Sequence, residues 1–179
     1  MTSRTSAPLT FITAPATILK GSGITTIVTE LSAARKDKAA SSGVADHVLD
    51  PSADDVKARV LELTAGVGAD AAFECAGVNA VLDTMLDVVK PAGVVVNVSI
   101  WGHPATVDMQ KVVLKEIDLR GTIAYCGDHA AAIKLVQGGK VDLKPFITGR
   151  IALDDLVDKG FDTLINHNDT AVKIIVHPS

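Results

Sequence analysis

The sequence predicts an α/β fold, in which helices cover both faces of an open, doubly wound parallel sheet. Short β-branched runs alternate along the chain with helix-like segments, and this alternation requires right-handed crossovers between parallel strands. Apolar residues make up 47% of the 179 residues, but aromatic residues make up only 3%. The core must therefore consist of Val, Ile, Leu and Ala, as is common when both faces of a parallel sheet are covered.

The alternation gives the expected positions of the strands and helices. Strands are expected at five β-branched or apolar runs, which are residues 24–30, 47–49, 71–75, 94–100 and 117–125. Helices are expected at four segments between or after these runs, which are residues 32–42, 53–64, 79–90 and 129–137. This order is typical of an open parallel sheet.

Residues at the ends of these segments support the boundaries. Ser32 and Ser52 are N-cap candidates, because a hydroxyl oxygen can accept a hydrogen bond from a free N–H group of the first helical turn. Gly43 and Gly66 follow helices as C-terminal stops. Pro91 cannot continue the helix that precedes it.

The N-terminal segment before residue 24 allows two interpretations. One is a single helix at about residues 9–20. The other is a strand at residues 9–13, followed by a short helix that begins at Ala14 and has Pro15 in its first turn. In the first interpretation no unambiguous strand precedes the helix.

The C-terminal segment also departs from the alternation. After residue 144 the sequence predicts a strand at 146–150, a helix at 153–164 and a final strand at 171–177, which together form a strand–helix–strand appendage. The expected domain organisation has three parts, which are a divergent N-terminal segment (1–23), an α/β core (24–145) and the C-terminal tail (146–179).

Composition and charge exclude several classes of protein. The net charge is −4 and no dense Lys/Arg cluster is present, which argues against a nucleic-acid partner. No apolar run approaches the roughly 18 residues that span a membrane. Cys75 and Cys126 lie far apart without metal-ligand spacing, so we expect a reducing, cytoplasmic location. A cleaved targeting peptide is the alternative interpretation of the N-terminus. It is suggested by residues 1–29, which contain no acidic residue.

The run at residues 24–30 carries the clearest functional signal. It ends in Glu30, after which Ser32 opens a helix that contains Arg35. In dinucleotide-binding folds an acid at the end of the second strand accepts hydrogen bonds from the adenosine ribose hydroxyls. A glycine-rich phosphate-binding turn normally precedes that acid by about 20 residues. Residues 6–14 contain no glycine, so the sequence presents only half of such a cofactor site.

An ordered set of short motifs makes this signal specific. The motifs lie at residues 29–35, 43–50, 68–77, 91–93, 96–98, 115–117, 121–125 and 147–153. With these motifs the chain resembles the C-terminal half of a zinc-dependent medium-chain alcohol dehydrogenase, closest to the 2,3-butanediol and sorbitol dehydrogenase branch. The resemblance extends from about residue 18 to residue 178 and implies an incomplete Rossmann-like sheet.

The resemblance also identifies what the chain lacks. Proteins of the family are roughly twice as long, and their first half is a catalytic domain whose Cys, His and Glu side chains bind a zinc that polarises the alcohol oxygen. None of those positions exists in this sequence, so we expect no zinc. The first Rossmann strand is missing or replaced by residues 9–13, and the three fingerprint glycines fall on Ala7, Leu9 and Ile12.

Several positions match cofactor contacts of the family. Glu30 is expected to bind the adenosine ribose and to favour NAD over NADP, and its alternative is a solvated acid at a strand end. Arg35 is expected to lie along the adenine, or else to be an ordinary surface residue. Cys75, Ala76 and Gly77 match small residues that pass close to the cofactor, although Cys75 alone also suits a buried small hydrophobe.

Three further positions match contacts to the nicotinamide end of the cofactor. The main chain at Val98 and Ile100 is expected to face the nicotinamide ring, and Ile123 matches the carboxamide contact. These contacts use main-chain groups, so the identity of the side chain tests them poorly.

Catalytic candidates are few and weak. His103 follows the strand expected at 94–100, and Tyr125, Asp128 and His129 follow the next strand. His129 suits a general base with Asp128 or Tyr125 nearby, because loops at the carboxyl ends of parallel strands line the ligand crevice. The alternative is that Asp128 caps a helix and His129 lies on its exposed first turn. The five histidines have no metal-ligand spacing, so no metal site is expected.

Two hypotheses for the function follow. The first is a truncated butanediol- or sorbitol-type oxidoreductase that binds NAD at most partially and needs a complementary catalytic-domain chain for hydride transfer. The second is a scaffold that serves as a binding or assembly module, or that catalyses a redox-neutral cyclisation or isomerisation of a small molecule in the crevice. The resemblance implies a homodimer through the strand at 117–125. Whether the chain is an enzyme on its own stays open at this point.

Overall fold

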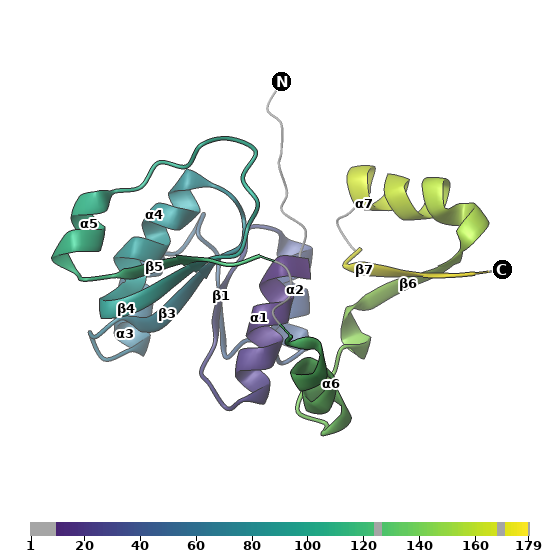
Figure 1. The fold of residues 1–179 in the computed structure, drawn as a ribbon, viewed down its shortest axis with the longest axis horizontal. Coiled ribbons are helices and arrows are strands. Elements are labelled where there is room, and N and C mark those ends of the chain that lie inside the picture. The colour runs from purple at the N-terminus through teal and green to yellow at the C-terminus, as the bar shows by residue number, and fades with distance from the viewer. Residues whose placement is uncertain (1–9, 124–126, 168–170, 179) are drawn as a thin grey trace. The chain divides into compact units, whose positions relative to one another are not determined.

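The computed structural model describes residues 10–123, 127–167 and 171–178 (Figure 1). The chain folds into two compact units. The central unit contains residues 50–123, and the split unit contains residues 10–49 together with the described residues after 126. Each unit has its own parallel strand pairing, as the sequence predicts for an α/β protein. The expected domain boundaries at 23 and 145 stay predictions.

The central unit is a three-stranded parallel sheet with three helices (Figure 1). Its strands are β3 (Ala69–Glu74), β4 (Val89–Asn97) and β5 (Asp118–Gly121), in the order β3-β4-β5, and its helices are α3 (Val56–Leu63), α4 (Asn79–Val88) and α5 (Met109–Leu114). Helix α4 contacts β3, β4 and both other helices. Leu86 on α4 and Val95 on β4 are fully buried. The β-branched run of β4 and the apolar face of α4 therefore form the core of this unit.

The split unit combines the N-terminal and C-terminal segments. Its first part contains α1 (Thr10–Gly21), β1 (Ile27–Thr29), α2 (Ala33–Ser41) and β2 (His47–Leu49), and β1 pairs with β2 in parallel. A core cluster joins these elements to the C-terminal segment, and its members are Ala16, Val28, Ala39, Val44, Phe146 and Val172. The apolar tail therefore finds part of its cover inside the split unit.

The C-terminal part of the split unit is a strand–helix–strand arrangement. After α6 (His129–Gln137) and η1 (Lys144–Phe146), strand β6 (Ile147–Ala152) pairs in parallel with β7 (Lys173–His177). The connection is not one continuous helix but three short turns of different type, which are η2 (Leu153–Asp155), η3 (Leu156–Phe161) and α7 (Asp162–Asn166). Among the described residues, no helix is both long and apolar enough to cross a membrane.

Some expected boundaries are wrong for identifiable reasons. The helix expected at 79–90 ends at Val88, and Pro91 lies inside β4. Proline disfavours a helical residue before it, so the last expected turn does not form. The N-cap of α3 is Asp55 rather than Ser52, because the Asp55 side chain accepts the Ala58 N–H at 3.0 Å. Ser52 instead donates its N–H to Asp50 Oδ1 at 2.9 Å.

Two other expectations fail at the level of whole elements. Residues 10–13 belong to helix α1, so the alternative of a strand at 9–13 is wrong for those residues. Helix α5 has no counterpart among the expected helices, although Asp108 caps it and accepts the Gln110 N–H at 2.9 Å. A six-residue helix offers too little periodic pattern to be recognised in the sequence.

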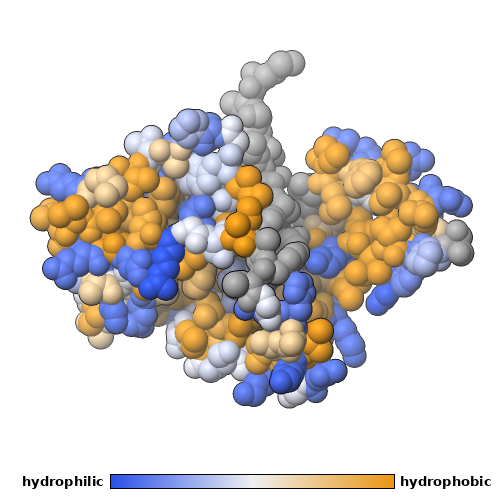
Figure 2. All heavy atoms as spheres, in the orientation of Figure 1, coloured by the Kyte–Doolittle hydropathy of each residue, from blue (hydrophilic) through white to orange (hydrophobic). Residues whose placement is uncertain are grey.

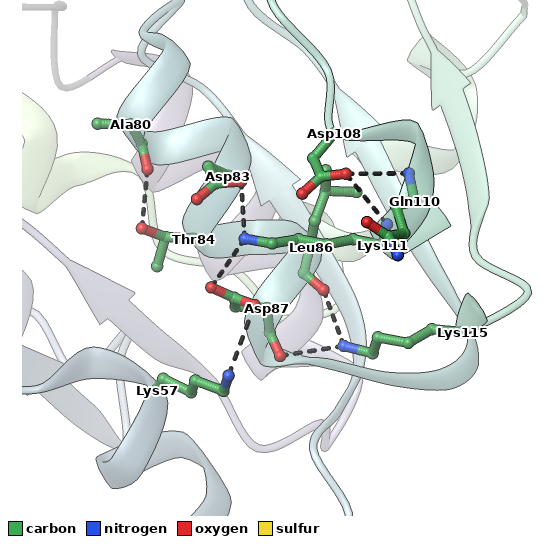
Figure 3. Close-up of polar contacts among 10 residues, drawn as sticks. All are labelled: Lys57, Ala80, Asp83, Thr84, Leu86, Asp87, Asp108, Gln110, Lys111 and Lys115. Atoms are coloured by element: carbon green, nitrogen blue, oxygen red, sulfur yellow. Dashed lines mark hydrogen bonds and ion pairs between the residues drawn. The ribbon is translucent and has the colours of Figure 1, made fainter. Parts of the chain in front are cut away.

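An ion-pair network connects the three helices of the central unit to one another (Figure 3). The Lys111 ammonium donates to Asp83 at 2.7 Å and to Asp87 at 3.0 Å, and Lys57 lies 3.6 Å from the other Asp87 oxygen. The hydrogen bond to Asp83, with smaller effects of Asp87, raises the pKa of Lys111 above its usual value although burial opposes the shift. Burial alone raises the pKa of Asp87, but the two lysines outweigh it and the pKa lies below its usual range.

Lys115 connects the end of α4 to the turn after α5 (Figure 3). Its ammonium donates to the carbonyl oxygens of Leu86 at 2.8 Å and Asp87 at 3.0 Å. These carbonyls belong to the last turn of α4, where a cation also interacts favourably with the helix dipole. Burial lowers the pKa of Lys115 below its usual value. The network therefore holds α3, α4 and α5 to one another.

Candidate cofactor site

The carboxyl ends of β3, β4 and β5 lie at one edge of the central sheet, because the three strands are parallel and neighbours. Main-chain hydrogen bonds continue past the strand ends. The Val98 N–H donates to the Glu74 carbonyl at 2.8 Å, and the Thr122 N–H donates to the Asn97 carbonyl at 3.1 Å. The segments after the three strands therefore lie side by side, as ligand-binding loops of α/β sheets do.

Glu74 organises the segment after β3. It is the last residue of that strand and has 0% exposed surface. Its Oε1 accepts the N–H groups of Ala76 and Gly77, both at 2.9 Å, and its Oε2 accepts the Ser99 hydroxyl. Three donors thus compensate for the burial of a carboxylate. Glu74 is absent from the candidates that the sequence suggests, although an acid at the end of an apolar strand is the same signal that identified Glu30.

Cys75 behaves as a buried small hydrophobe. Its exposed fraction is 7%, and burial, with a smaller effect of the neighbouring Glu74 charge, raises the pKa of its thiol to about 12. The thiol therefore stays protonated at neutral pH and is a poor nucleophile. Of the two interpretations of Cys75, packing is the one that its surroundings favour, whereas a direct contact of the residue with a cofactor stays a prediction.

Gly77 supplies the left-handed backbone conformation of the turn after β3. Its φ is +69°, and a Cβ atom there would lie 3.5 Å from the Ile100 carbonyl oxygen. The side chains of Ile100 and Ile123 are 80% and 79% exposed, and Val98 is half-buried. The structure thus gathers Gly77, Val98 and Ile100 at the strand ends.

The described catalytic candidates are divided between the two units. His103 lies in the central unit with its ring 5.7 Å from that of Trp101, and its Nδ1 is 3.1 Å from the Pro104 carbonyl oxygen. Asp128 and His129 lie in the split unit, at the N-cap and first residue of α6, and both are exposed. These are the positions expected if Asp128 caps a helix. Tyr125 lies outside the described residues.

Glu30 follows β1 in the split unit and is buried rather than solvated. Only 6% of its side chain is exposed, and 14% of that of Arg35. The Ser32 N–H donates to Glu30 Oε1 at 2.9 Å, and Arg35 Nη2 donates to the same oxygen at 3.1 Å. The Glu30 N–H donates to the Leu49 carbonyl at 3.1 Å, which extends the pairing of β1 with β2. Main chain and side chain together therefore fix the carboxylate.

The donor set at Glu30 fits one end of a dinucleotide. Both hydrogen bonds described for the carboxylate reach Oε1, which leaves Oε2 to accept hydrogen bonds from a ribose diol. Of the three positions that match the fingerprint glycines, Ile12 lies in helix α1, whereas Ala7 and Leu9 lie outside the described residues. The fit at Glu30 therefore concerns the adenosine ribose.

The described His, Cys, Asp and Glu side chains were compared with the arrangement that a metal ion requires. In the parts of the chain that the structure describes, no three His, Cys, Asp or Glu side chains are placed to hold a metal ion together.

Comparisons with known proteins found one matching family and several dehydrogenases. A family described as "Zinc-binding dehydrogenase" matches residues 14–138. The (R,R)-butanediol dehydrogenase of Neisseria gonorrhoeae is 61% identical over 164 residues, which are 92% of this chain and 46% of that protein. The corresponding enzyme of Bacillus subtilis is 39% identical over 163 residues, 90% of this chain and 46% of that protein.

A solved structure of a butanediol dehydrogenase is similar to this chain in fold. The crystal structure of 2R,3R-butanediol dehydrogenase from Bacillus subtilis superimposes with a TM-score of 0.84 and 36% identity, and the match covers 92% of this chain and 47% of that chain. The expectation of a Rossmann-like cofactor-domain fold is confirmed by this likeness. The chain spans about half the length of the curated relatives it matches.

Proposed function

The chain belongs to the zinc-binding dehydrogenase family, and on that premise we propose that it is the nucleotide-binding half of a butanediol dehydrogenase-type oxidoreductase, with NAD as its cofactor. The observation that supports this proposal is the buried Glu30 carboxylate at the carboxyl end of β1, held through Oε1 by Ser32 and Arg35. A carboxylate oriented in this way is pre-organised to accept hydrogen bonds from the two hydroxyls of an adenosine ribose.

The residues that match cofactor contacts of the family have distinct tasks in this proposal. Glu30 binds the ribose diol and disfavours a 2′-phosphate by charge repulsion, so NAD is preferred over NADP. Arg35, paired with Glu30, flanks the adenine. The main chain at Val98, Ile100 and Ile123 orients the nicotinamide end. When bound, NAD supplies the hydride acceptor.

Binding of the alcohol substrate requires groups that the described residues do not provide. We propose that a catalytic domain like that of the longer relatives holds the alcohol, either in the same polypeptide or in a complementary chain. The matched region corresponds to 46% of the butanediol dehydrogenases, which leaves the remainder for that task. A cytoplasmic location agrees with the free, buried thiol of Cys75.

NADH binding tests the proposal. We expect NADH to raise the thermal midpoint of the purified chain more than NADPH does, because a ligand that binds only the native state stabilises it by RT ln(1 + [L]/Kd). Glu30→Gln keeps the size of the side chain but removes its charge, and should weaken NADH binding about ten- to hundredfold, the usual value of a hydrogen bond to a charged group. The difference between NADH and NADPH should shrink in the same variant.

The matched control is Glu62→Gln. It makes the same chemical change at a side chain that is 67% exposed on α3 and pairs only with Arg59 among the contacts described. It should bind NADH like the wild type. If millimolar NADH moves neither the midpoint nor the fluorescence of the wild type, the chain does not hold NAD on its own and the proposal fails.

An assembly role is the second candidate, and one surface supports it. Strand β5 is exposed along its length and, among the described strands, pairs only with β4. Val113 and Leu114 on the adjoining α5 are 67% and 74% exposed, and Figure 2 shows apolar surface over this helix. Exposed edges and apolar patches of this kind favour association, so we propose a homodimer through β5 and α5.

Oligomeric state measured by light scattering tests the dimer. The wild type should have twice the mass of one chain, and the double change Val113→Asp with Leu114→Asp should give a monomer, because two buried carboxylates oppose the interface. Val67→Asp, at another exposed apolar residue of the central unit (59% exposed), should stay dimeric. A monomeric wild type at high protein concentration would contradict the proposal.

A further inference from the structure

Two acidic residues of this chain have the same local geometry but different surroundings. Glu30 and Glu74 each follow or end a parallel strand, and each carboxylate turns back so that Oε1 accepts the N–H group two residues further on, at 2.9 Å in both cases. The contacts of the second oxygen distinguish them. In Glu30 no described hydrogen bond reaches Oε2, whereas in Glu74 Oε2 accepts the Ser99 hydroxyl. Glu30 is therefore able to bind a ligand, and Glu74 is committed to the protein.

The contacts of Glu74 join two segments that are distant in sequence. Through Oε1 it holds the turn at Ala76 and Gly77, and through Oε2 it reaches Ser99, 25 residues further along the chain. Its main-chain carbonyl oxygen also accepts the N–H groups of Val98 at 2.8 Å and Ser99 at 3.3 Å. Glu74 is thus bonded to the segment after β3 and to the segment after β4 at the same time.

The network continues from Ser99 to the only tryptophan of the chain. Asn97 Nδ2 donates to the Ser99 carbonyl at 2.9 Å, and Asn97 Oδ1 lies 3.1 Å from the Ser99 hydroxyl. The indole N–H of Trp101 donates to the same Oδ1 at 2.8 Å. A change at Glu74 or Ser99 must therefore alter the surroundings of Asn97, and through it those of Trp101.

We propose that Glu74 is a positioning residue for the dinucleotide, which acts through Ser99. It holds the turn at residues 75–77 and the main chain at 98–100 in one arrangement, so that both segments face the nicotinamide end together. The two segments are in van der Waals range, because a Cβ atom at Gly77 would lie 3.5 Å from the Ile100 carbonyl oxygen. This inference rests on the proposed function, since it assumes that a dinucleotide binds at these strand ends.

Substitution of either partner separates positioning from general stability. In Glu74→Gln the amide oxygen still accepts the two N–H groups, but the NH₂ group faces the Ser99 hydroxyl, which must turn its hydrogen toward Asn97. Ser99→Ala removes only the hydroxyl and leaves the carboxylate in place. If Glu74 acts through Ser99, the two changes break the same link and their effects must not add.

The experiment measures NADH affinity and Trp101 emission in the wild type, the two single variants, the double variant and Glu62→Gln. Each single variant should weaken NADH binding about tenfold, and the double variant should be no weaker than about tenfold, because coupled residues are non-additive. Trp101 emission should shift by the same amount and in the same direction in both single variants. Glu62→Gln should match the wild type in both measurements.

Three results would overturn the inference. The first is an NADH affinity of the double variant about a hundredfold below that of the wild type, because the two effects would then multiply. The second is that Ser99→Ala binds NADH like the wild type. The third is that Trp101 emission is unchanged in both single variants. If Glu74→Gln does not fold, Ser99→Ala alone still decides, since it creates no buried charge. If the wild type does not bind NADH, the proposed function fails, and the Trp101 emission separately shows whether Glu74 couples the two segments.

Discussion

Leu86→Ala should lower the free energy of unfolding of the central unit by about 3 kcal/mol, within the range measured for fully buried leucines. Leu86 has 0% exposed surface and lies on α4, the helix that contacts both β3 and β4. Its truncation removes apolar contacts and leaves a cavity, because neighbouring atoms relax only partly. Denaturant unfolding followed by circular dichroism gives the value.

Val67→Ala is the control for this change. Val67 belongs to the same unit, lies outside the proposed dimer surface and is 59% exposed, so its truncation should alter the free energy of unfolding by less than about 0.5 kcal/mol. A loss below about 1 kcal/mol for Leu86→Ala would mean that α4 does not carry the core of the central unit. The strands that carry the candidate site would then depend on other elements for their packing.

Gly68→Ala should be nearly as costly, with a loss of about 3 kcal/mol from two causes. Gly68 has a φ of +98°, a conformation that residues with a Cβ adopt rarely. A Cβ atom there would also lie 2.9 Å from the Val88 carbonyl oxygen and 3.0 Å from the Lys90 nitrogen. These are main-chain atoms at the junction of α4 and β4, so the contact is relieved only if this junction moves away from the start of β3.

Gly66→Ala separates the two causes. Gly66 has a φ of +84°, but beyond its chain neighbours no atom lies within 4 Å of its Cβ position. Its replacement should cost only the conformational part, about 1 kcal/mol. Equal losses in the two variants, measured by denaturant unfolding, would show that the close approach of the α4–β4 junction at Gly68 has no effect on stability.

Local signals predicted much of the secondary structure. The helix at His129–Gln137 and the strand at His47–Leu49 have the expected bounds. Both are continuous runs whose neighbours include strong turn or capping residues. The helix expected at 153–164 is broken into η2, η3 and α7 instead, because the packing of residues far apart in sequence can override a local helical pattern.

The sequence predicted a residue of the candidate site only where the residues next to it in sequence indicate its position. Glu30 follows a β-branched run and precedes a helix, so its place at a strand end could be read from adjacent residues. Glu74 also ends a strand, but its role depends on Ser99, 25 residues away. Contacts of that kind arise from the parallel pairing of β3 with β4, whose register the sequence pattern does not specify.

The central claim is that this chain holds the adenosine end of NAD through Glu30. Calorimetric titration with ADP-ribose tests it most directly, because this ligand contains the adenosine ribose and lacks the nicotinamide. We predict that the wild type and Glu62→Gln bind ADP-ribose and that Glu30→Gln binds it about ten- to hundredfold more weakly. Absence of binding to the wild type at millimolar ADP-ribose, or equal affinity in Glu30→Gln, would contradict the claim.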